Sequence, residues 1–414
     1  MDLYSKIADE ALQKYRILEE ESKDILELHK RNYIPIPGDF DNIEEHEHID
    51  EHTLVKGLEE NGLRFSAIVG NDISKESKNI KIRKPEDLGE KELAALGLED
   101  IESIEDKYLA YVVSKLDKIV LVDAHEDAQE SMLIMGSRLN VAILANTGKK
   151  VSLRISGLVM TTSKRAEIGI YSNMHADEHS DLGIDIVHNE GAGANVLSFS
   201  KGSAELGASI SFNSAYFGGD ITRSRNRISA TAPTSSVSLN DVTIATNKQK
   251  VDILNFITNI AGKTKSESHS RVIAFDRSMC IVKGFAKIGK GSSESSSYIE
   301  QKGISVGKGA QVQALPEMAI EESNVKAKHS ASVVPINDDV LFYITSRGVP
   351  YESSRRLLLI SFASQLINKF GSDFAKIIAY SILQKKIMGD IEPMPSAGIE
   401  FNSVLKSTNG LVME

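Results

Sequence analysis

Residues 151–156 read Val-Ser-Leu-Arg-Ile-Ser, so that Val151, Leu153 and Ile155 alternate with polar residues. A period of two is the pattern of a β-strand with one buried face. The same alternation returns in short runs at 168–170, 184–186, 210–212 and 237–239, and Gly, Asn, Asp or Ser separates most of them. Many short strands over roughly 200 residues favour a β-solenoid over a sandwich, because a thin rung becomes stable only by stacking on its neighbours.

Helical spacing replaces this alternation near both ends of the chain. Leu3, Ile7 and Ala11 recur every three or four residues, and two apolar stretches of helical period follow Pro350. We therefore expect a mainly β protein, with a right-handed parallel β-helix between N-terminal and C-terminal helical regions. Residues 251–260 also follow a helical period, which predicts a helix among the strands. The expected divisions are an N-terminal helical region over 1–117, a β-helix core over 118–345, a C-terminal helical domain over 346–388 and a flexible tail over 389–414.

The charge of the chain argues against general nucleic-acid binding. Its net charge is −10, which repels phosphates. Arg223, Arg225 and Arg227 alternate with Ser and Asn, and this spacing is typical of a solvated strand face. We expect no nucleic-acid partner.

The single cysteine, Cys280, excludes an internal disulfide. It lies between apolar residues, which is typical of a buried small side chain, although Arg277 and Lys283 nearby keep a reactive thiol open. The first four residues lack a signal-peptide pattern, and no apolar run reaches the roughly 20 residues of a membrane span. A cytoplasmic protein without a membrane partner is expected.

Two enzyme classes remain as alternatives. His175-Ala176-Asp177-Glu178-His179 matches the H-x-x-E-H pattern of zinc peptidases, in which a helix brings both imidazoles to one zinc ion. The flanking residues here indicate a turn between strands instead. A polysaccharide-active β-helix enzyme needs clustered catalytic carboxylates, and no paired-Asp rung is evident. There is also no P-loop lysine motif, so we expect no ATP hydrolysis by this chain.

The most specific stretch, residues 316–362, reads PEMAIEESNVKAKHSASVVPINDDVLFYITSRGVPYESSRRLLLISF. It resembles the C-terminal core of the SufB/SufD family, which shows Val-Lys-Ala-x-His-x-Ala, an acidic turn, Leu-Phe-Tyr, Ser-Arg-Gly and an apolar helix ending in Gly-Phe. Residues 218–223 and 283–288 also look like family positions. SufB-type chains carry a cysteine after the Gly-Phe pair. Here Ser361 and Ala363 flank Phe362, so the resemblance favours a SufD-like subunit.

The resemblance implies a non-catalytic scaffold for building iron–sulfur clusters. Such chains pair through their β-helices, as homodimers or heterodimers with a second SufB/SufD-type chain, and their C-terminal helices dock the ATPase subunit SufC. The cofactor implied is a transient iron–sulfur cluster shared with the partner chain, with no metal bound stably to the isolated chain. One cysteine cannot supply the thiolates that such a cluster normally needs.

The resemblance also assigns individual residues. His329 matches the motif histidine and is the candidate cluster ligand, whereas Cys280 stays a possible thiol. The docking candidates are Leu357, Leu358, Phe362 and Leu366 on the first apolar helix. The structural motif comprises Phe342, Tyr343, Arg347 and Gly348, and both aromatic residues are expected in the core.

Overall fold

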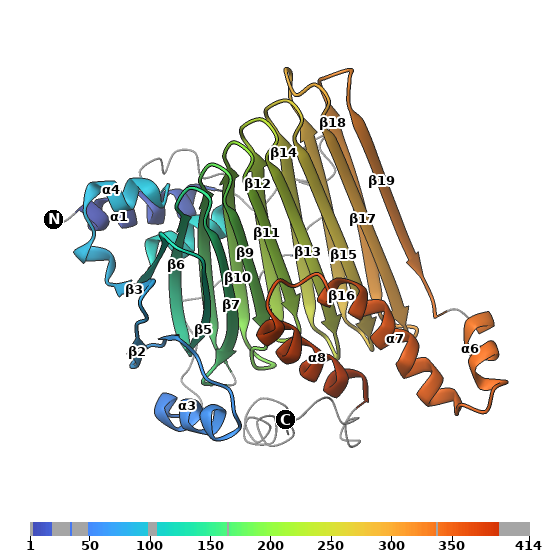
Figure 1. Cartoon of the computed structure of the whole chain (residues 1–414). Helices are drawn as coiled ribbons and strands as arrows, with labels where there is room; N and C mark the ends of the chain where they lie inside the picture. The colour runs from blue at the N-terminus through green and yellow to red at the C-terminus, as the bar shows by residue number, and fades with distance from the viewer. Residues whose placement is uncertain are drawn as a thin grey trace.

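Two large β-sheets make up most of the chain in the computed structural model, which describes residues 3–18, 34, 49–97, 106–163, 165–336 and 338–388 (Figure 1). From β4 onward, successive strands alternate between the sheets, and neighbours within each sheet are parallel. Each coil thus contributes one strand to each sheet. The predicted parallel β-helix with helices at both ends is confirmed.

The strands of both sheets are mostly eight to eleven residues long. The nine-stranded sheet contains, in order, β18 (Gln311–Ile320), β16 (Met279–Ile288), β14 (Lys250–Asn259), β12 (Ile221–Ala230), β10 (Asn195–Ala204), β8 (Glu167–Ala176), β6 (Arg138–Thr147), β4 (Lys118–Ala124) and β3 (Ile80–Arg83). The ten-stranded sheet contains β19 (Lys326–Val334), β17 (Ser296–Val306), β15 (Lys265–Phe275), β13 (Ser236–Ala245), β11 (Ser209–Tyr216), β9 (Asp181–His188), β7 (Ser152–Thr161), β5 (Ala128–Gly136), β1 (Ala67–Val69) and β2 (Ser74–Lys75).

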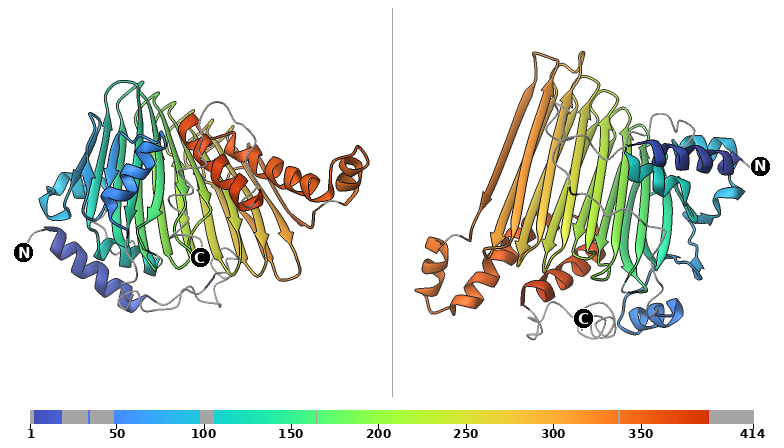
Figure 2. Two further views of the ribbon diagram at one scale, coloured as in Figure 1. Left: turned by 90° about the horizontal axis from the view of Figure 1, so that it is seen from below. Right: turned by 180° about the vertical axis from the view of Figure 1, so that it is seen from behind.

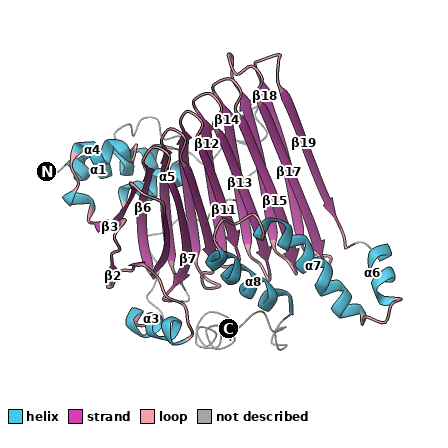
Figure 3. Ribbon diagram, viewed as in Figure 1, coloured by secondary structure: helices cyan, strands magenta, loops and turns pink. Residues whose placement is uncertain are grey.

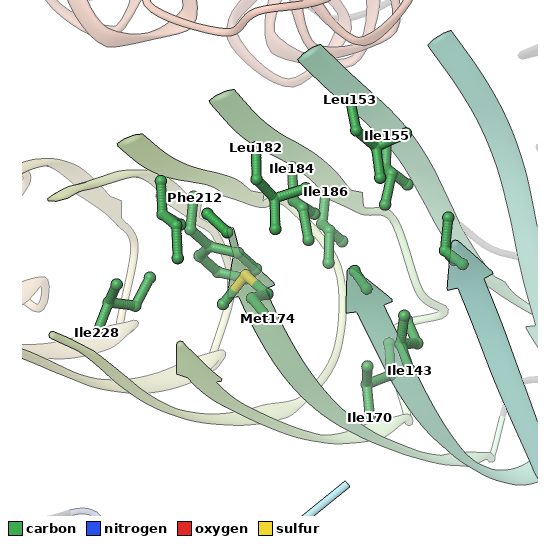
Figure 4. Close-up of a cluster of buried hydrophobic side chains, with 14 of the residues drawn as sticks. Ile143, Leu153, Ile155, Ile170, Met174, Leu182, Ile184, Ile186, Phe212 and Ile228 are labelled. Atoms are coloured by element: carbon green, nitrogen blue, oxygen red, sulfur yellow. The ribbon is translucent and has the colours of Figure 1, made fainter. Parts of the chain in front are cut away.

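The alternating runs of the sequence are stacked rungs of this solenoid. Leu153, Leu182, Ile210 and Val237 pair with one another through successive coils of the ten-stranded sheet. All four belong to one buried cluster in the space between the two sheets, here called the lumen. Figure 4 shows Leu153 and Leu182 pointing into this space, as does Ile170 from the nine-stranded sheet. Stacking removes these apolar surfaces from water, and this burial is the main force that holds the coils together.

Helices from both ends of the chain lie against the outer faces of the two sheets (Figures 2 and 3). The helices of the described residues are α1 (Leu3–Ile17), α3 (Glu51–Glu60), the 3₁₀ helix η2 (Pro85–Asp87), α4 (Glu90–Ala95), α5 (Lys107–Ser114), α6 (Asp338–Thr345), which extends past the β-helix, α7 (Tyr351–Ile367) and α8 (Asp373–Met388). Helices α1 and α5 pack against Leu197 and Phe199 on the nine-stranded sheet. Helices α7 and α8 pack against Val187 and Val242 on the ten-stranded sheet.

The prediction of a helix over residues 251–260 is wrong, because residues 250–259 form strand β14. Val251, Ile253 and Ile257 point into the lumen, whereas Leu254 lies on the outer face. Both faces of this strand carry apolar residues, so the apolar positions do not keep a simple period of two. Their spacing then imitates a helix.

The arginine row on β12 is not the solvated face that its spacing indicated. Arg223 is only 3% exposed, and Arg225 Nη1 lies 3.0 Å from Asp252 Oδ1. Lys283 Nζ, completely buried, lies 3.2 Å from the same oxygen. Burial alone opposes ionisation of Asp252, but Arg225, Lys283 and Arg223 hold the pKa of its carboxyl well below its usual range. Of the three arginines only Arg227 is exposed, and its guanidinium lies 4.8 Å from the ring centre of Phe256.

The observed elements differ in detail from the expected divisions. The last strand ends at Val334, and residues 338–345, which were expected in the β-helix core, form helix α6. The expected N-terminal helical region also contributes the short strands β1, β2 and β3 to the edges of the two sheets. The tail expected to be flexible, residues 389–414, lies outside the described residues.

Candidate functional site

The C-terminal end of the β-helix is open. Strands β18 and β19 are the last strands of the two sheets, and no other described strand covers them. Most residues of β19 are exposed, whereas those of its neighbour β17 are buried or half-buried. Three apolar side chains at this end are 40–48% exposed: Ile320, Val333 and Val334. An open edge with apolar side chains is a template for pairing with another chain.

The backbone of β19 leaves alternate residues facing its free edge. Lys326 donates its N–H to Ser295 O, so Lys326 and every second residue after it bond to β17. The residues that direct their N–H and C=O groups to the free edge are therefore Ala327, His329, Ala331 and Val333.

The free edge of β18 is less suited to pairing. Gln311 donates its N–H to Ser278 O, so every second residue from Gln311 bonds to β16. Pro316 then falls at a free-edge position, where it has no N–H to donate. Strand β19 contains no proline and offers the more complete edge.

His329 lies at this open end, as expected from its place after the last full coils. It pairs in register with Ile299, a completely buried lumen residue, so its side chain is on the lumen side of β19. The imidazole is exposed nevertheless, because no further coil follows. It forms no hydrogen bond with any other residue that the structure describes. Both ring nitrogens are therefore accessible to a ligand or a partner chain.

Cys280 does not lie near this end's surface. It is the second residue of β16 and is completely buried in the lumen beside Tyr216, Val251 and Val282. Burial raises the pKa of the Cys280 thiol to about 12, although Lys386 opposes the rise. The group is therefore a protonated thiol at neutral pH in this conformation, which favours the buried-residue interpretation over the reactive one.

The four docking candidates on α7 differ in accessibility. Leu357 is 46% exposed and Leu358 is half-buried. Phe362 is partly buried against the ten-stranded sheet, with the Arg271 guanidinium 5.6 Å from its ring centre. Leu366 is only 2% exposed and belongs to the core beneath α7. It cannot serve as a surface anchor while α7 stays on the sheet.

Phe342 and Tyr343 are not in the core, contrary to expectation. They are 74% and 56% exposed on α6, whereas the neighbouring Leu341 is buried. A helix of eight residues that lies beyond the β-helix buries only one stripe, and these two residues fall outside it (Figure 1). The Arg347 guanidinium lies 4.4 Å from the Tyr343 ring centre, and Gly348 supplies the left-handed φ of +93° that ends the turn.

An apolar surface therefore follows the α6–α7 elbow. We define the elbow surface by its exposed members, Val340, Phe342, Tyr343, Tyr351 and Leu357, which are 38–74% exposed. These side chains belong to two consecutive helices, α6 and the start of α7, and exposed apolar side chains gathered in this way are typical of interaction sites on proteins. Sequence reasoning missed most of this surface, because the sequence does not show whether an apolar residue on a short helix is buried in the core or exposed.

The two C-terminal helices are fastened to the β-helix by polar contacts from its outer face. The Asp185 carboxylate accepts the N–H groups of Gly371 and Ser372 at the start of α8, at 3.1 and 2.7 Å. Arg271 contacts Glu300 at 2.5 Å and Gln365 of α7 at 3.2 Å. These contacts hold the last turn of α7 and the start of α8 against the ten-stranded sheet.

The H-x-x-E-H residues do not form a zinc peptidase site. His175 lies on β8 and contacts Ser203 Oγ at 3.0 Å, and Glu178 is paired with Lys149 at 2.9 Å. His179 occupies a left-handed corner position, with φ of 58°, and stacks over Gly207. A strand and a corner cannot bring both imidazoles to one side as a helix would. Among the described residues, no cluster of three His, Cys, Asp or Glu side chains is placed to hold a metal ion.

Asp241 is a buried carboxyl that sequence reasoning missed. It follows Val237 and Leu239 at alternate positions of β13, so its side chain points into the lumen. This alternation is the sequence pattern from which its burial could have been predicted. Its Oδ2 accepts hydrogen bonds from Ser270 at 2.6 Å and Asn255 at 2.7 Å. Burial raises the pKa of Asp241 to about 6, and these two hydrogen bonds moderate the rise.

Asp241→Asn should reduce the loss of folding stability that the parent protein suffers as the pH rises to neutral. The folded protein holds the Asp241 proton up to about pH 6, whereas the unfolded chain releases it near 3.8. This contribution to the free energy of unfolding is complete below about pH 4 and is lost as the pH rises through about 6. The variant avoids that loss. Its stability relative to the parent should therefore rise by about 2 kcal/mol between pH 4 and pH 7.5. Urea unfolding at both pH values measures this, and a constant difference would contradict the expected pKa.

The helices of the described part of the chain include none that is both long and apolar enough to cross a bilayer.

Residues 128–362 match the family model described as "SUF system FeS cluster assembly, SufBD core domain". The chain is 28% identical over 150 residues to an iron–sulfur cluster assembly SufBD family protein of Porphyra purpurea. It is 21% identical over 154 residues to the iron–sulfur cluster assembly protein SufD of Escherichia coli, and 30% identical over 112 residues to SufD of Bacillus subtilis.

These alignments cover 36%, 37% and 27% of the chain and 31%, 36% and 26% of the respective relatives. The chain thus matches about a third of the length of its curated relatives. The family match is broader, because it includes more than half of the chain and spans the coils from β5 to the open end and the following α6 and most of α7. The chain therefore belongs to the SufBD family, named for the core domain of the SUF system of FeS cluster assembly.

Proposed function

We propose that the protein is a non-catalytic scaffold subunit in cytoplasmic iron–sulfur cluster assembly. Family membership supports this role over the two enzyme alternatives. The observation that carries the proposal is the open end of the β-helix, where the strand edge of β19 and the exposed His329 both lack a hydrogen-bonding partner among the described residues. Such an end provides both a pairing surface and a metal ligand.

Pairing with a second SufB/SufD-type chain runs through the free edge of β19. Four residues direct backbone groups to that edge, and pairing satisfies them by adding a strand to the ten-stranded sheet. The same contact buries Val333 and Ile320, which are 40% and 48% exposed in the single chain. Either a second copy or a different family member fits this description, and mass measurement separates the two.

The SufC-type ATPase docks on the elbow surface at the C-terminal helices. Phe342 and Leu357 are its most accessible aromatic and aliphatic anchors, and aromatic anchors dominate binding energy at protein interfaces. This placement moves the docking site from the middle of α7 toward α6. Because the chain lacks a P-loop motif, ATP hydrolysis is the task of the docked subunit.

The iron–sulfur cluster is cargo at the pairing interface, where His329 helps to hold it. A neutral imidazole is a competent iron ligand, and His replaces Cys in some natural clusters. Cys280 does not belong to this ligand set while it stays buried, because its thiol is then protonated and out of reach of the interface. The remaining ligands then come from the partner chain.

Replacing His329 by alanine should lower the amount of cluster that the reconstituted complex accumulates, by at least about tenfold if the imidazole is an essential ligand. The exposed side chain makes no hydrogen bond within the described chain, so folding, pairing and SufC binding should be unchanged. Iron and sulfide content and the visible absorption of the complex measure the cluster. His125→Ala, at an exposed turn at the other end of the solenoid, is the matched control. Parental cluster content in the His329 variant would remove its assigned role.

A further inference from the structure

A groove crosses the outer face of the ten-stranded sheet near the open end of the β-helix. It lies over the starts of β15, β17 and β19 and has a volume of about 620 Å³. In Figure 1 these strand starts lie at the upper edge of the sheet, whereas α7 crosses its lower part. A volume of this size is typical of binding sites for small molecules. The groove is distinct from the elbow surface, which lies on α6 and the start of α7.

The alternation of the three strands decides which side chains face the groove. Ile299 points into the lumen, so the residues directly before and after it on β17 point outward. The outward-facing residues form two levels across the strands: Lys265, Ser296 and Lys326 at the first level, and Glu267, Tyr298 and Lys328 at the second.

The groove is basic although the chain as a whole is acidic. Three lysines and one glutamate line it, which leaves a net charge of +2, against −10 for the whole chain. The glutamate, Glu267, is already paired, because its carboxylate lies 3.4 Å from His269 Nε2 and 2.6 Å from Lys265 Nζ. These two contacts lower the pKa of Glu267 to about 2. The uncompensated positive charge therefore belongs to Lys326 and Lys328.

Lys326 and Lys328 have no carboxylate partner among the described residues. Lys302, on the same face of the sheet, is instead paired with Glu300 at 2.9 Å. Two residues apart on one strand, Lys326 and Lys328 point to the same side and start about 7 Å from each other. Their long side chains can therefore bring two ammonium groups to one anion.

Tyr298 positions one of these ammonium groups over the groove. Lys328 Nζ lies 5.5 Å from the Tyr298 ring centre, which is a cation–π distance. The ring is held in turn, since its hydroxyl donates to Glu300 Oε1 at 3.2 Å and its edge meets the His269 ring at 5.3 Å between centres. Beside it, the Ser296 hydroxyl has no hydrogen-bonding partner among the described residues and is available as a donor.

We propose that this groove binds a ligand with two or more neighbouring phosphoryl groups, held by Lys326, Lys328 and the Ser296 hydroxyl. A terminal phosphoryl group carries a charge of about −1.5 to −2, so it attracts two ammonium groups more strongly than a singly charged carboxylate does. Lysine binds phosphate as a point charge, whereas planar carboxylates are matched by the fork of an arginine. None of the described residues that line the groove is an arginine. The inference does not depend on the proposed role in cluster assembly.

Titration calorimetry of the full chain with inorganic pyrophosphate tests the site. The double variant Lys326→Gln/Lys328→Gln should bind at least about tenfold more weakly than the parent, because two charged contacts are lost. Both side chains are exposed, so the melting temperature should not change. The control, Lys248→Gln/Lys308→Gln, removes the same charge from exposed corners at the other ends of the strands and should bind like the parent. A parent protein that does not bind pyrophosphate, or equal affinity in the parent and the first variant, would overturn the proposal. Equal weakening in the control would overturn it too, as a general charge effect.

Substitutions of Tyr298 test how Lys328 is positioned without changing the charge of the groove. Tyr298→Leu removes the aromatic ring and should weaken pyrophosphate binding by about two- to fivefold. Tyr298→Phe keeps the ring and should bind like the parent. Parental affinity in the leucine variant would contradict the positioning of Lys328 by the ring.

Two further ligands define the chemistry that the groove recognises. Citrate carries several carboxylates and should bind at least about tenfold more weakly than pyrophosphate, and equal affinity would overturn the assignment to phosphoryl groups. ADP distinguishes a nucleotide from free pyrophosphate as the source of those groups. Tighter binding of ADP indicates that the nucleoside also contacts the groove, and equal binding indicates that only the phosphoryl groups do. Either result supports the site if the Lys326/Lys328 double variant loses it.

Discussion

Ala331→Pro should separate the paired protein into single chains. Ala331 lies in β19 with its N–H directed to the free edge, so proline removes a donor from the pairing edge without removing a bond to β17. The proline ring also obstructs the approach of a partner strand. We expect pairing to weaken by at least about a hundredfold, which corresponds to about 3 kcal/mol. Light scattering coupled to size-exclusion chromatography measures the change, since one chain has a mass of 45.3 kDa.

The controls distinguish loss of pairing from loss of folding. Ala331→Ser keeps the N–H and should pair like the parent protein. Ala331→Pro should retain the circular dichroism spectrum and nearly the full melting temperature, because only the final strand is altered. If the proline variant folds and still pairs with parental affinity, β19 does not form the interface, and the edge of β18 becomes the next candidate despite Pro316.

Phe342→Asp should strongly weaken binding of the SufC-type ATPase. Phe342 is 74% exposed, so a charge at this position costs the isolated chain little. In a docked complex the same carboxylate would be buried in an apolar contact without a partner, which is strongly unfavourable. Aromatic anchors of this kind contribute about 2 kcal/mol or more, so the affinity should fall by at least about thirtyfold. Co-purification and titration calorimetry with the cognate ATPase measure the effect.

Ile260→Asp is the matched control for this substitution. Ile260 is an apolar side chain that is 50% exposed, and it lies at a corner of the β-helix after β14 rather than on the C-terminal helices. Its replacement should leave ATPase binding unchanged. Equal loss of binding in both variants would indicate a general charge effect, and undiminished binding of the Phe342 variant would exclude the elbow surface as the docking site.

Much of the β-helix could be predicted because its strands follow a local rule. Leu153, Leu182, Ile210 and Val237 each lie in an alternating run, and the structure places all four at one level of the ten-stranded sheet. Alternation depends only on which side of a strand faces the core. Strand β14 shows where the rule stops, since apolar residues on both of its faces produced a helical spacing.

The candidate sites were less predictable, because exposure depends on what lies across the fold. The sequence predicts a solvated Arg223, but in the fold Asp252 and Asp106 of the N-terminal region contact its guanidinium. Leu366 and Phe342 are both apolar helical residues, yet one is 2% and the other 74% exposed. The difference is that α7 lies on the ten-stranded sheet whereas α6 extends past its end.

By itself, the sequence determined the strand period, the β-helix and the position of His329 after the last coils. These follow from local alternation and from motif residues that are adjacent in the chain. Only the tertiary structure decided which edge of the open end has a full set of free N–H groups, which apolar helical residues remain exposed and which polar side chains meet in the lumen. Each of these depends on contacts between coils about thirty residues apart, and pairwise distances of that kind are set by stacking rather than by local sequence.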